Sequence, residues 1–221
     1  MKDIHAIRGK YYLQQAIAEG EHEHQDFKFA ISDARKIARS ISAFANNSGG
    51  RLLIGVKDNG VIAGVRNEED IYVIEQAAHL YCRPAQQLRF TAYRAAEGAV
   101  VIQADIDRCD APPVMAQEHD GSWHAYYRVA DENIAAPAIM VKSWRHKNTG
   151  TFNLITFNTA EQSLLDLLRD MPHVSIEDFM LQCHISRRTA EECISRLYAM
   201  DIIRFKFVDR IFAVALASET D

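Results

Sequence analysis

The amino-acid sequence predicts an α+β protein with two domains, the first spanning residues 1–150 and the second residues 151–221. Before residue 150, segments that alternate like strands mix with segments that have the apolar spacing of helices, which predicts a mixed sheet covered by helices. The polar run His146-Lys147-Asn148-Thr149-Gly150 marks a boundary. Beyond it, three helical segments and a pair of short alternating segments predict a separate small domain.

The overall composition limits the classes of protein to consider. With 221 residues, 48% hydrophobic and 25% charged, the chain is ordinary for a globular protein of one large or two small domains. It has no apolar run near the ~20 residues of a membrane span. Residues 1–10 lack the apolar core of a signal peptide, so a cytoplasmic location without membrane contact is expected. The four cysteines lack CxxC spacing, which favours reduced thiols.

Periodicity places the first elements of the first domain. Residues 6–18 have the spacing of a helix, and residues 25–31 alternate as a strand. Ser32-Asp33 is a suitable N-cap for an amphipathic helix whose apolar residues recur at helical spacing. Gly49-Gly50 end this helix where left-handed backbone costs least.

The rest of the first domain is predicted to be richer in strands. The apolar run 52–56 reads as a strand, and Asp58-Asn59-Gly60 is a hairpin signal leading into residues 61–65. Residues 137–145 could form either a short helix or a strand. The remaining elements are a helix over residues 68–82 capped by Asn67, and strands over residues 88–94, 99–106, 114–117 and 123–129.

The pattern becomes helical from Thr159 onward. The predicted elements are a helix capped by Thr159, helices over residues 176–183 and 187–200 capped by Ser175 and Ser186, and a hairpin of residues 202–207 and 211–215. Three helices followed by a hairpin resemble a winged helix-turn-helix. Such a module places side chains that contact DNA at the start of its third helix.

The most specific pattern lies between Glu21 and Gly64. It opens with E-x-E-x-x-D-F-K over residues 21–28 and continues with SAFANNSGGRLLIGVKDNGVIAGV over residues 42–65. Downstream, YYRVADENIAAP over residues 126–137 adds a Tyr-x-Arg element. Together these segments resemble the AlbA-like domain of the Schlafen type. The resemblance implies a nucleic-acid-binding domain, often fused to a helix-turn-helix in bacteria. It also implies a homodimer, because Schlafen-type domains resemble pairs of such lobes.

The same resemblance implies a hydrolytic alternative. Glu21, Asp26 and Asp58 fall where ribonuclease-active Schlafen domains carry three metal-binding carboxylates. Three such oxygen donors on Mg²⁺ or Mn²⁺ would orient water for cleavage of structured RNA. Asp26 departs from the family pattern, which has Glu there, and its shorter arm requires the backbone or the ion to move. The alternative is that Glu21 and Asp26 are solvated charges and Asp58 only forms its turn.

Two other polar features favour structural roles. His22 and His24 would share one face of a strand, but no third ligand follows at zinc spacing, which favours surface histidines. The turn Asn46–Gly50 could form an anion-binding nest. It follows a helix instead of preceding one, and the chain has no G-K-[ST] motif, so a turn into a strand is favoured over a nucleotide site.

The charge balance is unfavourable for a dedicated DNA-binding protein. The net charge is −5, and from Thr159 onward eleven acidic residues face seven basic ones, which is typical of a protein-interaction or dimerisation module. Any contact with nucleic acid must therefore use local basic groups. The candidates are Lys28, Arg35, Lys36, Arg39, Arg51 and Arg128 in the first domain, and Arg187, Arg188, Arg204, Lys206 and Arg210 in the second.

Three functional hypotheses follow. The leading one is a nucleic-acid-binding protein acting as a transcriptional regulator, with DNA or structured RNA as its partner. The second is a metal-dependent endoribonuclease that uses Glu21, Asp26 and Asp58. The third is a protein-interaction or dimerisation module without nucleic acid.

Overall fold

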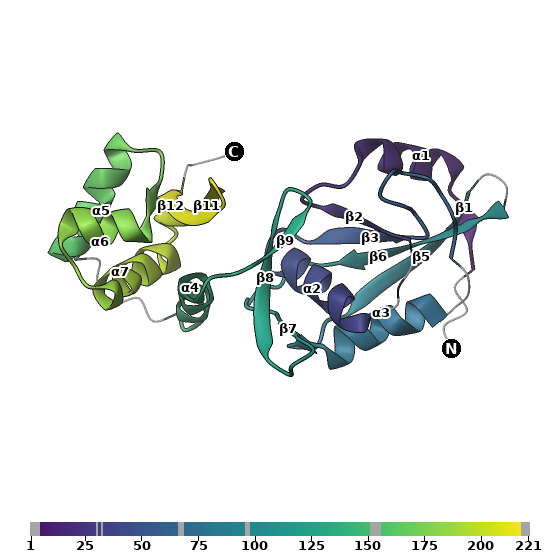
Figure 1. Cartoon of the computed structure of the whole chain (residues 1–221), viewed down its shortest axis with the longest axis horizontal. Helices are drawn as coiled ribbons and strands as arrows, with labels where there is room; N and C mark the ends of the chain where they lie inside the picture. The colour runs from purple at the N-terminus through teal and green to yellow at the C-terminus, as the bar shows by residue number, and fades with distance from the viewer. Residues whose placement is uncertain are drawn as a thin grey trace. The chain divides into compact units, whose positions relative to one another are not determined.

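The protein is seen in a computed structural model that describes residues 5–29, 31, 33–65, 69–95, 98–150 and 156–217. The chain divides into two compact units, Met1–Ala136 and Pro137–Asp221. Each unit has a hydrophobic core of its own, so each is described separately (Figure 1). None of the helices in the described ranges has the length and hydrophobicity that crossing a bilayer requires.

A mixed five-stranded sheet forms the centre of the first unit, as the sequence predicts. Its strand order is β1 (Ile7–Arg8), β5 (Leu88–Arg94), β6 (Val100–Ile106), β3 (Gly50–Ile54) and β2 (Gln25–Lys28). The outer pairs β1–β5 and β2–β3 are parallel, and the inner pairs are antiparallel. The two edge strands therefore need crossover connections, which the helices supply.

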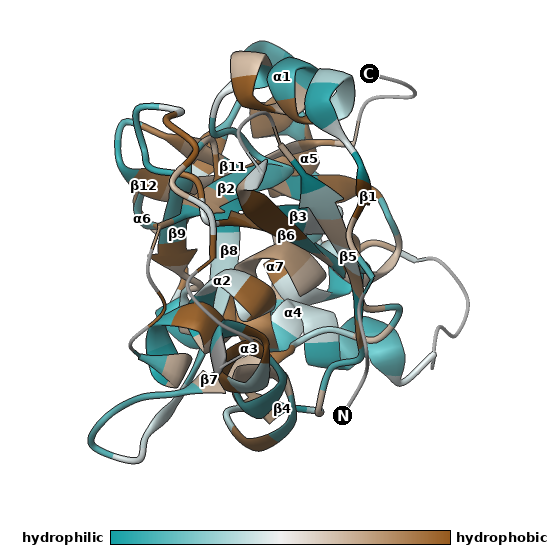
Figure 2. Ribbon diagram, turned by 90° about the vertical axis from the view of Figure 1, so that its right-hand side faces the viewer, coloured by the Kyte–Doolittle hydropathy of each residue, from teal (hydrophilic) through white to brown (hydrophobic). Residues whose placement is uncertain are grey.

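Helices cover both faces of this sheet (Figure 1). The helix α1 (Lys10–Glu19) lies on one face, and α2 (Ala34–Ala45) and α3 (Glu69–Leu80) lie on the other. The alternation of β3 serves both layers, because Leu53 joins the cluster of α1 while Leu52 joins the cluster of α2 and α3. Figure 2 shows α1 divided between hydrophobic and hydrophilic residues, as expected for a helix that covers a sheet.

The helix α2 is enclosed by two sheets. Its second neighbour is an antiparallel sheet of β4 (Cys82–Arg83), β7 (Met115–Gln117), β8 (Trp123–Val129) and β9 (Glu132–Ala135). Because α2 is packed on two sides, its small polar residues Ser40 and Ser42 are buried together with its apolar ones. The segment S-A-F-A-N is thus the end of a central helix.

The second unit consists of helices and a small antiparallel sheet. Leu164, Phe179, Ile194 and Val214 are buried in its core. The sheet order is β10-β12-β11, and both of its pairs are antiparallel. The elements are α4 (Ala138–Asn148), α5 (Thr159–Asp170), β10 (Val174–Ser175), α6 (Ile176–Cys183), α7 (Arg187–Ala199), β11 (Ile203–Val208) and β12 (Ile211–Leu216).

Local contacts explain where element bounds differ from expectation. The first helix begins at Lys10, because Ile7 and Arg8 pair with β5 as a short strand. Residues 61–65 form no strand, and only a bridge between Val56 and Ile62 closes that hairpin. The ambiguous segment after Pro137 is the helix α4, which packs against α7. The division between the units therefore falls one helix earlier than residue 150.

Helix caps follow the predicted chemistry with one shift. Asp33, Ser175 and Ser186 accept backbone hydrogen bonds at the starts of α2, α6 and α7. The cap of α5 is Asn158 instead of Thr159, because Asn158 and Glu161 form a reciprocal capping box. The predicted cap residues Ser32 and Asn67 lie outside the described residues.

Candidate nucleic-acid interface

Asp26 lies buried on the edge strand β2 of the first unit. The side chain of Asp26 is 5% exposed. Lys28 Nζ lies 2.7 Å from Asp26 Oδ2, and Ser40 Oγ donates to the same oxygen at 3.4 Å. The guanidinium of Arg128 lies 3.6 Å from Asp26 Oδ1. Both carboxylate oxygens of Asp26 are thus occupied by groups of the protein.

Glu21 meets Asp26 beside this strand. Its Oε1 accepts a hydrogen bond from the backbone N–H of Phe27 at 2.8 Å. Burial is the main cause that raises the pKa of Glu21 to about 7. The hydrogen bond to Asp26 and the charge of Asp26 act in the same direction, whereas the Phe27 N–H lowers this pKa. A substantial fraction of Glu21 is therefore protonated near neutral pH.

Asp58 differs from Glu21 and Asp26 in its exposure to solvent. It lies exposed in the turn after β3, where the N–H of Gly60 donates to the carbonyl of Lys57 at 2.7 Å. Within the described ranges, His, Cys, Asp and Glu side chains form no group of three or more that could hold a metal ion. The three acids therefore do not fit the Mg²⁺ or Mn²⁺ site that the resemblance implies, since one is a turn residue and another is neutralised by cations.

Arg128 is a structural residue and not a surface contact for phosphate. It is 1% exposed, and its guanidinium lies 4.9 Å from the ring of Phe44. It donates to the carbonyls of His22 and Gln25 at 3.2–3.4 Å and to Asn133 Oδ1 at 2.9 Å. Arg128 thus adds a donor to two carbonyls at the edge of the sheet, which also accept the backbone N–H groups of His22 and Gln25. The burial of Arg128 therefore leaves it no exposed surface for the contact with nucleic acid that the sequence predicted.

Most other basic candidates of the first unit also have partners inside the fold. Arg39 forms a bidentate pair with Glu118 and so lowers the pKa of that carboxyl. Arg51 donates to Gln25 Oε1 and Glu19 Oε2, both at 2.6 Å.

The remaining two candidates differ from each other in exposure. Arg35 lies over the ring of Tyr81 at 4.5 Å and is half-buried. Lys36, one residue later on α2, is exposed. Of the six basic residues predicted in the first unit, Lys36 is thus the one most open to a phosphate.

The family-like motif itself joins elements of the fold. Asn46 Oδ1 accepts from the N–H of Val114 at 2.6 Å, and its Nδ2 donates to the carbonyls of Val114 and Tyr126 at 2.8 and 2.9 Å. A Cβ added at Gly50 would lie 2.3 Å from the ring of Phe44, so the glycine permits close packing. The structural interpretation of the glycine turn therefore agrees with its contacts.

His22 and His24 lie in a turn and not on a strand. The chain turns between the paired residues His22 and Gln25, and the N–H of His24 donates to His22 Nδ1 at 3.1 Å. They border a shallow hollow of about 360 Å³ together with Ser48, Arg51 and Asp105. The expectation that both residues share one strand face was wrong, because β2 begins only at Gln25.

The second unit presents two arginines at the start of α7. Arg188 is 87% exposed at its side chain, and its Nε donates to Glu192 at 3.0 Å. Arg187 donates to Glu177 of α6 at 2.8 Å, and both side chains are more than half exposed. The free N–H groups and dipole at a helix start add favourable potential for a phosphate. This is the location that the winged-helix resemblance predicts for contacts with DNA.

The hairpin of β11 and β12 carries further exposed cations. Arg204 and Lys206 are two residues apart on β11, so both side chains project from one face. At the tip, Asp209 and Arg210 both have positive φ, 50° and 64°, as a tight two-residue hairpin turn requires.

Basic residues on α4 change the charge balance of the second unit. Lys142, Arg145 and Lys147 bring its totals to ten basic and eleven acidic residues, a net charge of −1. Sequence reasoning missed these residues because the helix was not assigned. Their spacing within six residues was the available signal. Lys142 and Lys147 pair with Glu191 and Asp201 of the same unit.

Comparisons with known proteins bear on the first unit most directly. The family model described as Schlafen, AlbA_2 matches residues 21–137. No match is found among curated proteins. Among solved structures, the DIP2311 protein from Corynebacterium diphtheriae is similar at 20% sequence identity and a TM-score of 0.44. That match covers 72% of this chain and 33% of the other, so the chain spans about a third of that protein's length.

Proposed function

The chain belongs to the Schlafen AlbA_2 family, and from this membership we propose that it is a DNA-binding transcriptional regulator whose second unit is a winged helix. The family is consistent with a nucleic-acid-binding protein. Contact with DNA is assigned to the second unit, because the arginines of the first unit are largely held by partners within the fold.

The order of elements in the second unit supports the winged-helix assignment. The chain runs α5, β10, α6, α7, β11 and β12, and the short strand β10 pairs with β12. The link from α6 to α7 is short, and His184 ends α6 in the left-handed conformation with φ 52°. Such a tight connection between two helices is typical of helix-turn-helix modules, which place the second helix in the major groove.

The observation that carries the proposal is the exposed start of α7. Arg187 and Arg188 face solvent beside a helix N-terminus, and their acidic partners are exposed too. Exposed ion pairs of this kind are worth only about 0–1 kcal/mol, so phosphate or guanine can replace Glu177 and Glu192 at small cost. Arg204 and Lys206 on the hairpin would add contacts with the backbone.

The proposal includes a homodimer. Schlafen-type domains resemble pairs of lobes, and the chain carries one match to the family model. Helix-turn-helix dimers bind two half-sites separated by about one helical turn, or 10 base pairs. An inverted repeat with that spacing should therefore bind more tightly than a single half-site.

Salt-dependent DNA binding tests the proposal. Anisotropy of labelled duplex DNA is measured between 50 and 200 mM salt, alongside a structured RNA of equal length. We expect affinity for DNA to fall steeply with salt, and Arg187→Ala plus Arg188→Ala to reduce the slope of log K against log salt by about 2.

The matched control removes two positive charges elsewhere. Lys57→Ala plus Arg169→Ala changes exposed residues outside the proposed interface and should leave the slope nearly unchanged. Binding that ignores salt, or that both double variants weaken equally, would contradict the proposal. Preference for RNA with no effect of the Arg187 and Arg188 substitutions would assign nucleic acid to another surface.

A further inference from the structure

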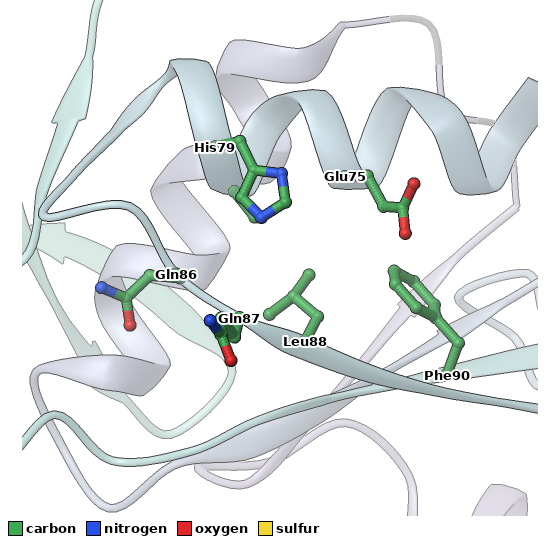
Figure 3. A pocket seen from close by; sticks show the side chains of 7 residues that line it. Glu75, His79, Gln86, Gln87, Leu88 and Phe90 are labelled. Carbon is green, nitrogen blue, oxygen red and sulfur yellow. The ribbon is translucent and has the colours of Figure 1, made fainter. Parts of the chain in front are cut away.

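A hollow of about 310 Å³ lies in the first unit between α3 and β5 (Figure 3). Glu75 and His79 are one helical turn apart on α3 and extend toward the strand. Leu88 and Phe90 occupy alternate positions on β5 and rise toward them. Ala78, which is buried, closes the helix side. The strand β5 thus contributes apolar side chains to the hollow, and α3 contributes a carboxylate and an imidazole beside Ala78.

Three polar side chains around this hollow have unused hydrogen-bonding capacity. Across the described ranges, Glu75, His79 and Gln87 make no side-chain hydrogen bond, ion pair or ring contact with another residue. Gln86, on the same rim, differs because its amide donates to the carbonyl of Pro84 at 2.8 Å. The free groups supply one carboxylate acceptor, one imidazole and one amide, and each can face a bound molecule.

The arrangement selects for a flat ligand with a hydrogen-bonding edge. Phe90 and Leu88 line the hollow, so the ring of Phe90 is the aromatic group on which a flat ligand would stack. The Glu75 carboxylate accepts hydrogen bonds only, so it favours an N–H edge and opposes a carbonyl edge. His79 and Gln87 can each donate to a ring nitrogen. A volume near the lower end of small-molecule sites suits one base or nucleoside.

We propose that this hollow binds a nucleobase that carries an exocyclic amine (adenine, cytosine or guanine), stacked on Phe90 with its amine donating to Glu75. The base comes either from a free nucleoside or from an unpaired position of a nucleic-acid strand. The site is separate from the proposed DNA contact of α7, and it stands whether or not that contact exists. Uracil presents a carbonyl where adenine and cytosine present the amine, so it can offer Glu75 only its ring N3–H, flanked by two carbonyl oxygens that oppose the carboxylate.

Titration calorimetry of the full chain with adenosine, cytidine and uridine tests the site. Adenosine and cytidine should bind at least about tenfold more tightly than uridine, the discrimination typical of one good paired contact with a base. Glu75→Gln should reduce that preference to a few-fold or less, because the amide offers uridine a donor. Phe90→Ala should weaken all three nucleosides by about tenfold through lost stacking.

The control and the second arm separate the possible outcomes. Asp110→Asn removes the same charge from an exposed position outside the hollow and should bind like the parent protein. Competition by an unpaired oligo-adenosine, but not by duplex DNA, identifies a base within a strand, whereas competition by nucleosides alone identifies a free ligand. Equal affinity for adenosine and uridine, or no effect of Glu75→Gln and Phe90→Ala, overturns the proposal. Absence of binding by nucleosides and oligonucleotides at millimolar concentration overturns it as well.

Discussion

Arg128 of the first unit and Arg188 of the second carry the same side chain in opposite surroundings. Arg128 is 1% exposed, donates to the carbonyls of His22 and Gln25, and lies beside the carboxylate of Asp26. Arg188 is 87% exposed at its side chain, and among the described residues its ion-pair partner is Glu192 on its own helix. The first arginine is part of the fold, and the second is available to a partner.

The contrast extends to the motifs that contain these residues. The Tyr-x-Arg element and the S-A-F-A-N segment identify the family, yet Arg128 and Asn46 both use their polar groups to join the two sheets around α2. The exposed arginines at a helix start, Arg187 and Arg188, lie in the less distinctive second unit. Residues that define a family by sequence are therefore not automatically the residues that touch its ligand.

The largest expected effect is that of Arg128→Ala on stability. Removal of the guanidinium leaves the buried carboxylate of Asp26 with Lys28 as its remaining cation and removes a second donor from the carbonyls of His22 and Gln25. Breaking a buried pair in this way costs about 3–5 kcal/mol. Urea denaturation followed by tryptophan fluorescence should show a corresponding fall in the free energy of unfolding.

Arg188→Ala is the matched control, because the same atoms are removed from an exposed site. It should change the free energy of unfolding by less than about 0.5 kcal/mol. If both variants lost the same stability, the division of arginines into structural and accessible classes would be wrong.

Asn46→Ala should have the next largest effect. The substitution leaves the buried N–H of Val114 without its acceptor and removes the donor to Tyr126. Unsatisfied buried backbone groups cost about 1–3 kcal/mol, and we expect a loss of about 2–3 kcal/mol in urea unfolding. Asn47→Ala removes an exposed bond to Glu23 and a longer one to the carbonyl of Arg128, and should cost less than half as much. Equal losses would refute a special role for Asn46.

Much of the fold was predictable because periodicity reports burial. The strands β5 and β8 match their predicted bounds, and α6 was placed with its cap Ser175. Short strands were missed, including β1, β4, β9 and β10, because two to four residues carry too little alternation to be distinguished. Of these strands, β1, β4 and β10 pair with partners that are distant in sequence, whereas β9 pairs with the preceding strand β8.

The candidate site was harder to predict than the fold. Spacing aligned Glu21, Asp26 and Asp58, but it carried no information on which acids would meet cations. Charge alone likewise put Arg128 and Lys36 in one class, although one is buried and the other exposed. The start of α7 was predictable because Ser186, followed by two arginines, combines a helix cap with exposed charge.

The raised pKa of Glu21 in the first unit predicts a dependence of stability on pH. The pKa of Glu21 is raised to about 7, so between about pH 4.5 and 7 the folded protein holds more protons than the unfolded chain. Its contribution to stability therefore falls as pH rises through this window. Glu21→Gln resembles the protonated acid and keeps an acceptor for the Phe27 N–H. Between pH 5 and 8, the free energy of unfolding should decline less for this variant than for the parent protein. The difference between the two declines should be smaller than the loss caused by Asn46→Ala, because Glu21 is partly solvated. Identical pH profiles for the two proteins would contradict the raised pKa of Glu21.

The smallest expected effect is that of Glu192→Gln, which removes the ion-pair partner of the exposed Arg188. In the free protein Arg188 donates to Glu192, and this exposed pair must open before the guanidinium contacts DNA. Such a pair is worth about 0.2–1 kcal/mol, so removing the charge should tighten binding to duplex DNA by up to about fivefold at low salt, with little change in stability.

Asp166→Asn, which releases Arg169 on α5, removes an equivalent exposed charge away from α7 and should leave affinity nearly unchanged. The gain from Glu192→Gln should also vanish when Arg188 is replaced by alanine. A gain that persisted without Arg188 would reflect general repulsion between the acidic helix and DNA, and Arg188 would then not be the contacting group.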